Sequence, residues 1–219
     1  MSASAEPGLS GLPTRFPIFP LGGAILLPGG NLPLNIFEPR YLQMTRDAMR
    51  TDKVIGMIQP SGEAIDGHPP IYRIGCAGRI TSFAETEDGR YLITLTGICR
   101  FDLIEELTVT TPYRQAIASF KRYGPDLQPL APPEAFRGCL LQALRGYFDV
   151  HDINADFAQI EAAPLDGLIT SLAMICPFSP SEKQALLEAP CCESRARVLV
   201  ALMEMGACGG GDRARPVTH

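Results

Sequence analysis

The chain has 219 residues, of which 46% are hydrophobic and 20% are charged, and its formal net charge at pH 7 is −5. This balance is typical of a globular protein that can bury a core, and the acidity disfavours nucleic-acid binding, because phosphate contacts need a basic surface. The first residues lack the basic and apolar regions of a signal peptide, and the first apolar run is too broken by proline and glycine to span a bilayer, so we predict a cytoplasmic protein without membrane contact.

The beginning of the chain predicts a sheet interrupted by one helix. Residues 1–13 are rich in glycine and proline and are expected to be flexible. Short apolar runs punctuated by proline then favour strands, with the prolines at strand ends or sheet edges; these runs are 16–19, 24–27 and 31–37. Pro39 suits the first position of a helix, and Glu38 suits the cap before it, where a negative charge meets the positive end of the helix dipole. Residues 53–59 return to a strand.

Residues 71–120 are predicted to be almost entirely strand. Glu87-Asp88-Gly89 is a turn between two β-rich runs, which predicts a hairpin. From Tyr91 onward apolar side chains occupy both faces of the strand. Such a strand is covered on both sides or belongs to a sheet that closes into a barrel.

The period of the apolar residues changes to that of helices after residue 133. Residues 124–133 are rich in proline and are predicted to form a stiff, extended linker. The helices expected beyond it run from Phe136 through Phe148 and over residues 156–162, 165–175, 179–190 and 193–205. Ser179 and Glu182 form a capping box, and Gly206 is expected to end the last helix. Residues 207–219 are expected to be disordered. The organisation is therefore a β-rich unit over residues 14–123 and a helical bundle over residues 134–206, an α+β fold.

No familiar catalytic or metal-binding pattern occurs in the sequence. The phosphate-binding P-loop, the G-x-S-x-G elbow and the H-E-x-x-H zinc motif are absent, and the seven cysteines show no C-x-x-C spacing. We expect reduced, mostly buried thiols, a surface turn at His68, and His151 at the end of a helix. Glu105 and Glu106 are adjacent in a strand, so their side chains point to opposite faces and cannot act as a pair. The sequence thus predicts no catalytic residue, no metal site and no cofactor.

Four stretches of the chain, taken in order, carry a family resemblance. They are Phe19-Pro20-Leu21 through Leu32-Pro33-Leu34 to Phe37-Glu38-Pro39-Arg40-Tyr41, then Gly75-Cys76-Ala77-Gly78-Arg79-Ile80, then Gly97-Ile98-Cys99-Arg100-Phe101, and Glu182-Lys183-Gln184-Ala185-Leu186-Leu187-Glu188. Together they resemble the Lon protease amino-terminal (substrate-binding) domain family over about residues 14–205. The resemblance implies a PUA-like β pseudo-barrel followed by a C-terminal helical bundle.

The resemblance also implies a function. In full-length Lon proteases an ATPase module and a serine–lysine peptidase module follow this domain, and this sequence ends before either. The resemblance therefore implies a stand-alone, non-catalytic module that recognises unfolded or partner protein segments and contributes to protein quality control. Two alternatives stay open, a PUA-like RNA-binding protein and an unrecognised hydrolase, and the oligomeric state is not predicted.

A groove between the pseudo-barrel and the bundle is predicted to bind the substrate, with Phe37, Tyr41 and Arg100 close to one another. Arg100 is either a solvated strand residue or an anchor between the two halves. The remaining motif residues are expected to be structural: Pro20, Leu21, Pro33, Glu38, Arg40, Gly78, Gly97 and Phe101.

Specific roles are expected for four of these motif residues. Glu38 is predicted to cap the helix, and because Glu38 and Arg40 are two residues apart we do not expect them to face each other. Arg40 should pair with a carbonyl or carboxylate of the sheet. Gly78 and Gly97 should mark bulges or close approaches between chain segments.

Overall fold

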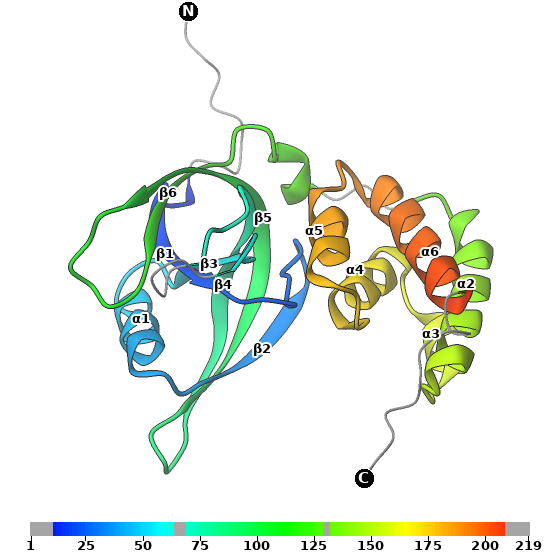
Figure 1. Ribbon diagram of the computed structural model, residues 1–219, viewed down its shortest axis with the longest axis horizontal. Helices are drawn as coiled ribbons and strands as arrows, with labels where there is room; N and C mark the ends of the chain where they lie inside the picture. Colours follow the sequence, from blue (N-terminus) through cyan, green and yellow to red (C-terminus); the bar gives the residue numbers. More distant parts are fainter. Residues whose placement is uncertain (1–10, 64–68, 129–131, 209–219) are drawn as a thin grey trace, which may run out of the picture.

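The computed structural model describes residues 11–63, 69–128 and 132–208. A curved sheet and a group of helices lie side by side along the long axis of the molecule (Figure 1). The turn expected at His68, the tail from residue 209 and the first ten residues of the expected flexible N-terminus lie outside the described residues. None of the helices within the described ranges has both the length and the hydropathy needed to cross a bilayer.

Six strands form one mixed sheet, and its last strand pairs back onto its longest one. The strands are β1 (Arg15–Pro20), β2 (Asn31–Ile36), β3 (Val54–Ile58), β4 (Ile74–Glu85), β5 (Tyr91–Leu107) and β6 (Gln115–Ser119). Their order is β2-β5-β4-β3-β1-β6, and β5 also pairs with β6. Five strands therefore close a ring while β2 stays outside it as an edge, so the sheet is a pseudo-barrel rather than a clean barrel. The α+β class predicted from the sequence is confirmed.

The inside of the ring is filled by aromatic side chains from distant strands. Phe101 is fully buried, and its ring centroid lies 5.2 Å from that of Phe16 and 6.4 Å from that of Phe120. Gly56 and Gly75 face the Phe101 ring, and a Cβ on Gly75 would stand 2.5 Å from it. These two glycines therefore leave the space that the Phe101 ring fills.

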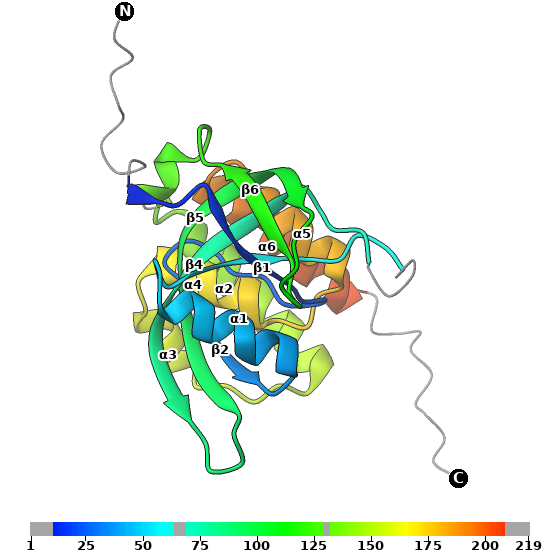
Figure 2. The same cartoon turned by 90° about the vertical axis from the view of Figure 1, so that its left-hand side faces the viewer.

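Helix α1 (Pro39–Met49) covers the side of the sheet that faces away from the other helices (Figures 1 and 2). Its buried face packs on the sheet through Tyr41, whose ring lies 4.3 Å from that of Phe19. The hydroxyl of Tyr113 donates a hydrogen bond of 2.8 Å to Asp47 in the same helix.

The strand predicted at residues 24–27 is wrong, because these residues form an irregular loop. Gly23 and Gly29 have positive φ angles of 74°, so a tight turn stands at each end of the run. Between the turns the side chains of Ile25, Leu26 and Leu27 are buried in the core. The apolar run correctly indicated burial. The turns at the flanking glycines prevent a strand, so these residues lie in the core as part of a loop.

Within the described ranges, five helices form the other half of the molecule. They are α2 (Phe136–His151), α3 (Phe157–Ala162), α4 (Leu165–Ile175), α5 (Pro180–Glu188) and α6 (Cys192–Cys208). The capping box is confirmed: Ser179 accepts from the Glu182 amide, and the Glu182 carboxylate accepts from the Ser179 amide at 2.7 Å. The prediction that Gly206 ends α6 is wrong, since the helix continues beyond it. A Cβ on Gly206 would lie 2.7 Å from the Tyr147 ring, so this glycine allows α6 to pack closely on α2.

The linker predicted to be extended contains a helical turn that packs on the sheet. Gly124–Leu127 forms a 3-10 helix, η2, next to β5, while residues 129–131 lie outside the described ranges. One hydrophobic cluster also crosses from the sheet to the helices, and it includes Leu95 of β5, Leu144 of α2 and Leu199 of α6. The junction between the two halves is therefore part of the folded core.

Candidate functional site

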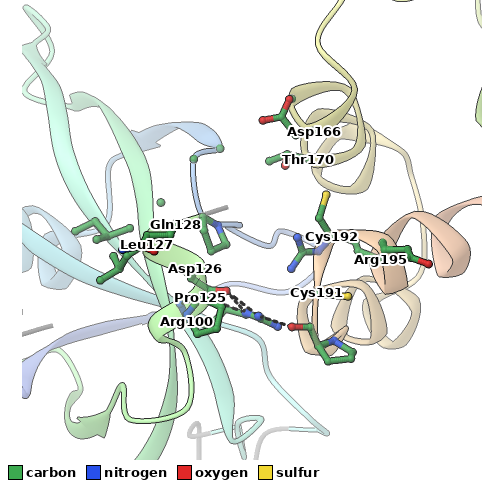
Figure 3. A pocket seen from close by; sticks show the side chains of 18 of the residues that line it. Arg100, Pro125, Asp126, Leu127, Gln128, Asp166, Thr170, Cys191, Cys192 and Arg195 are labelled. Carbon is green, nitrogen blue, oxygen red and sulfur yellow. Dashed lines mark hydrogen bonds and ion pairs between the residues drawn. The ribbon is translucent and has the colours of Figure 1, made fainter. Parts of the chain in front are cut away.

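A cleft of about 890 Å³ lies where the sheet meets the helices (Figure 3), and we refer to it as the junction cleft. One wall is formed by residues 28–31, the β5 segment from Gly97 to Arg100, and η2 with Gln128. The opposite wall is formed by the first half of α4 and by residues 190–195 at the start of α6. Prolines and Ile98 supply apolar surface, and two arginines supply positive charge.

The sheet wall of the junction cleft is shaped by a β-bulge. Ala77 pairs with Cys99 and Gly78 with Gly97, so Ile98 is an extra residue without a partner in β4. Ile98 and Arg100 are two residues apart in the strand, and both line the cleft.

The loop above this bulge is held to it by main-chain contacts. The Gly97 amide donates to the Gly30 carbonyl at 2.8 Å, and the Gly29 amide donates to the Gly97 carbonyl at 2.9 Å. A Cβ on Gly97 would lie 2.0 Å from the Leu27 carbonyl oxygen, and one on Gly78 would lie 2.5 Å from Leu26. The predicted roles of both glycines, a bulge and a close approach, are confirmed.

Arg100 joins the two halves of the molecule. Its side chain is 95% buried and forms an ion pair of 2.7 Å with Asp126 of η2, as Figure 3 shows. The same guanidinium donates to three main-chain carbonyls at the end of α5 and just after it, those of Leu187, Ala189 and Pro190. All of its five N–H groups are therefore engaged inside the protein. Of the two roles left open for Arg100, the structure shows the anchor.

Arg100 keeps its charge in spite of its burial. Burial acts to lower the pKa of Arg100, but the hydrogen bond and the charge of Asp126 raise it above the usual value. The main-chain amide of Arg100 also donates to Asp126, at 2.9 Å. Buried charges are stable only when their bonds are satisfied in this way.

Arg195 is the second buried arginine of the junction cleft, and its donors are mostly free. It stands on α6 with 6% of its surface exposed, and its Nε donates to the Leu186 carbonyl at 2.9 Å. Neither of its terminal nitrogens bonds to a described residue, and it takes part in none of the ion pairs of the described ranges. Burial, and then the charge of Arg100, lower the pKa of Arg195.

Two adjacent thiols lie at the start of α6 beside Arg195. Cys191 is exposed, and hydrogen bonds from the Ser194 side chain and main chain lower the pKa of its thiol. The expectation of mostly buried thiols is wrong, because Cys139 and Cys208 are also exposed and Cys192 is partly so. These cysteines stand at helix positions that face away from the core or at a helix start, where spacing alone does not decide burial.

A second set of polar contacts crosses the junction away from the cleft. Gln59 at the end of β3 donates to Gln184 of α5 at 3.1 Å and to the Pro180 carbonyl at 3.0 Å. Gln184 donates in turn to the Ile74 carbonyl of β4 at 3.1 Å. Lys183, the neighbour of Gln184, donates to the Met174 carbonyl at the end of α4. The Glu-Lys-Gln motif of α5 therefore caps its own helix, closes the end of α4 and fastens the bundle to the sheet.

The three residues predicted to bind the substrate are not brought together. Arg100 lines the junction cleft, whereas Phe37 and Tyr41 do not. Phe37 is 62% exposed, just before α1, and Tyr41 is buried in that helix on the other side of the sheet. Their role in binding stays a prediction, but the three cannot form one site as expected.

Glu38 and Arg40 do face each other, contrary to prediction. The Arg40 guanidinium donates to the Glu38 carboxylate at 2.8–2.9 Å and lies 4.5 Å from the centre of the Tyr41 ring. Glu38 occupies the cap position with an extended backbone, and its side chain makes no capping hydrogen bond. The helical spacing rule fails here because Glu38 stands outside the helix.

The remaining motif residues position the sheet. Pro20 ends β1, and the Leu21 amide after it donates to the Ile58 carbonyl at 3.0 Å. Pro33 lies in β2, the edge strand, where a residue without an N–H group is tolerated.

The histidines and carboxylates that the structure describes do not gather into a cluster. No group of three His, Cys, Asp or Glu side chains in these ranges could bind a metal ion. His151 ends α2 as predicted, with its Nδ1 2.9 Å from the Tyr147 carbonyl. Glu105 and Glu106 are exposed, and Glu106 pairs with Arg114.

Arg195 was missed by the sequence reasoning, although the sequence holds a signal for it. The buried face of α6 repeats at positions 195, 199 and 203, and the other two residues of that set are Leu199 and Met203. An arginine in the register of an apolar helix face is unusual, because such a charge is buried only at a cost. This irregularity could have identified the residue.

Comparison with known proteins places this geometry in a family. The model of the ATP-dependent protease La (LON) substrate-binding domain matches residues 15–205. Lon protease 2 of Myxococcus xanthus is 33% identical over 120 residues, which cover 52% of this chain and 14% of that protein. Lon protease 2 of Sorangium cellulosum is 25% identical over 196 residues, 85% of this chain and 24% of that protein. The chain thus spans less than a quarter of the length of these relatives.

Solved structures agree on the fold. The crystal structure of a Lon N-terminal domain protein from Xanthomonas campestris superposes with a TM-score of 0.60 at 26% identity, covering 86% of this chain and 98% of that one. The N-terminal domain of the Mycobacterium avium complex Lon protease gives a TM-score of 0.61 at 13% identity, with coverage of 86% and 97%. At that lower identity the likeness concerns the fold alone.

Proposed function

The chain belongs to the ATP-dependent protease La (LON) substrate-binding domain family, and from this premise we propose that it acts as a non-catalytic recognition module for exposed segments of other proteins. We place the binding surface in the junction cleft. A role in protein quality control follows if those segments belong to unfolded chains.

The observation that carries this proposal is the composition of the junction cleft. Its volume of about 890 Å³ falls within the range of pockets that bind ligands. Apolar surface from Pro28, Ile98 and Leu127 lies beside the free donors of Arg195 and the hydroxyls of Thr170 and Ser171. Apolar walls with a few polar groups suit a peptide, because they bury its side chains while bonding its main chain.

The chemistry of the described side chains supports recognition rather than catalysis. The most acidic thiol of the cleft, Cys191, is bonded to Ser194 and not to a histidine that could act as a base. The proteolytic activity of Lon proteases belongs to proteins of which this chain matches only a part. We therefore extend only recognition to this chain.

A single bulky residue in the junction cleft tests the proposal. Gly167 lies on α4 in the cleft wall, and a Cβ there meets no atom within 4 Å, so Gly167→Trp should fill the cleft without distorting the helix. We expect saturable binding of a reduced, carboxymethylated protein to the wild type, measured by fluorescence anisotropy, and at least about tenfold weaker binding to Gly167→Trp, which is a loss of about 1.4 kcal/mol.

The matched control is Gly138→Trp, which places the same side chain on an exposed helical position with equally open space outside the cleft. Equal loss in both variants would move the binding surface elsewhere. Saturable RNA binding with a steep salt dependence, or casein cleavage that persists through purification, would replace the proposal with one of the two alternatives.

A further inference from the structure

We propose that the junction cleft holds a carboxylate of the bound protein segment against the guanidinium of Arg195. The inference rests on the proposed function and adds the chemical class of the group recognised. The carboxylate belongs either to an aspartate or glutamate side chain or to the end of a polypeptide chain, and the experiment below separates these sources.

The first step is the incomplete bonding of Arg195. A guanidinium carries five N–H groups, and the only hydrogen bond from the Arg195 guanidinium to a described residue runs from Nε to the Leu186 carbonyl. No buried side-chain nitrogen or oxygen in the described ranges lacks a partner. The terminal nitrogens of Arg195 must therefore reach the open space of the cleft that this residue lines.

The second step is that Arg195 has no ion-pair partner among the described residues, although the charge of Asp126 acts on it from farther away. Arg100, the other cation of the junction cleft, is neutralised by Asp126, whereas Arg195 pairs with no carboxylate of the described residues. Burial and the charge of Arg100 lower the pKa of Arg195, yet an arginine stays protonated at neutral pH. An entering carboxylate would neutralise this charge and accept two parallel hydrogen bonds.

The third step is the position of α6. Cys191, Cys192 and Glu193 at the start of this helix line the same cleft, so the positive end of its dipole adds to the charge of Arg195. This contribution strengthens the site and would not define one without the arginine.

The acidic residues of the cleft limit the charge of a ligand that can bind there. Glu193 is already paired with Arg197 at 2.6 Å, and Asp166 is exposed on α4, in the same helical wall as Arg195 (Figure 3). Among the described residues of the cleft, one free cation with acidic neighbours suits a single carboxylate and repels a polyanion such as RNA. The apolar surface of Pro28 and Ile98 then accepts the neighbours of that carboxylate.

The test uses short, labelled apolar peptides that differ in one group. Three are amidated at the C-terminus and carry Glu, Gln or Lys at the central position, and a fourth is the Gln peptide with a free C-terminal carboxylate. Binding is measured by fluorescence anisotropy for the wild type, Arg195→Gln and Arg197→Gln. Arg197 lies on the same helix, 68% exposed, so its replacement makes the same change in net charge outside the cleft wall.

We expect a carboxylate peptide to bind the wild type at least about tenfold more tightly than the amidated Gln peptide, as a charge-assisted hydrogen bond allows. Arg195→Gln should abolish this preference, and Arg197→Gln should keep it. Whichever carboxylate peptide gains affinity identifies the source of the group. Thermal unfolding of Arg195→Gln confirms that the variant is folded.

Two results would overturn the inference in different ways. Equal binding of all four peptides, unchanged in Arg195→Gln, removes the carboxylate site and leaves the proposed function intact. Absence of binding by any peptide and by the carboxymethylated protein removes both. Competition of the Glu peptide by RNA with a steep salt dependence would show a polyanion site instead.

Discussion

The two buried arginines of the junction cleft stand in opposite bonding states. The guanidinium of Arg100 on the sheet wall has every donor engaged and a buried counter-ion, while that of Arg195 on the helical wall makes one hydrogen bond to the described residues and faces open space. The two side chains are buried to a similar degree, so their exposed fractions do not distinguish them. The number of N–H groups that form hydrogen bonds within the protein does: a fully bonded arginine stabilises the fold, and one with free donors can bind a ligand.

This contrast predicts a large difference in stability between two matched variants. Arg100→Gln leaves Asp126 buried without its partner, which costs about 3–5 kcal/mol of the free energy of unfolding. Arg195→Gln loses one hydrogen bond but also removes an uncompensated buried charge, so we expect a change of about 1 kcal/mol or less. Urea denaturation of the two proteins measures both values.

The double variant Arg100→Met with Asp126→Leu refines this prediction. Since both charges are removed together, most of the lost stability should return. If Arg195→Gln lowered the free energy of unfolding as much as Arg100→Gln, Arg195 would have to stabilise the fold as strongly as Arg100 does. That result would contradict the proposed difference between the two arginines.

A smaller effect is expected at Gly97, beneath the sheet wall of the cleft. Gly97→Ala drives a methyl group against the Leu27 carbonyl, so we expect a loss of about 1–3 kcal/mol of unfolding free energy. Gly138→Ala is the control, since an open, exposed helical position gains about 0.5–1 kcal/mol from the same change. Thermal unfolding should therefore shift in opposite directions, and shifts of the same sign would contradict the described contact.

The smallest effect concerns two thiols, one in β5 of the sheet and one at the start of α6. Burial, and then the charge of Asp126, raise the pKa of Cys99 to about 12, whereas the Ser194 hydrogen bonds lower the pKa of Cys191. Because the thiolate is the reactive form, Cys191 should be alkylated at pH 7.5 in the folded protein while Cys99 stays protected. Mass spectrometry of the labelled peptides measures both rates.

Ser194→Ala provides the control for that measurement. Without the hydroxyl, the pKa of Cys191 should rise, and the rate of alkylation at pH 7.5 should fall while the rate at pH 10 stays nearly unchanged. An equal fall at both pH values would indicate a change in access rather than in pKa.

The features that the sequence predicted well are those decided by neighbouring residues. The capping box at Ser179 and the helix over residues 165–175 depend on side chains within a turn or two, and both stand as predicted. The bulge glycines were recognisable because no other residue tolerates such a close approach of main chain.

The features that escaped prediction depend on residues far apart in the chain. Arg100 reaches carbonyls 87 to 90 positions away, and Gln59 bonds a residue 125 positions away. No local pattern encodes such partners, so the anchor role of Arg100 stayed one of two possibilities. For the same reason the sequence grouped Phe37 with Arg100, and the structure does not bring these residues together. Arg195 is an intermediate case. Its position on the buried face of α6 could be predicted from the sequence, but the open cleft in front of its side chain could not.

The main-chain contacts between Gly97 and the loop at residues 29–30 have a consequence for how such a module can diversify. A cleft wall fastened by main-chain amides and carbonyls does not depend on the identity of the side chains that project from it. If the cleft binds protein segments as proposed, those side chains can be exchanged for a different ligand while the main-chain contacts keep the shape of the rim. The same property makes this rim a natural place to graft altered specificity by design.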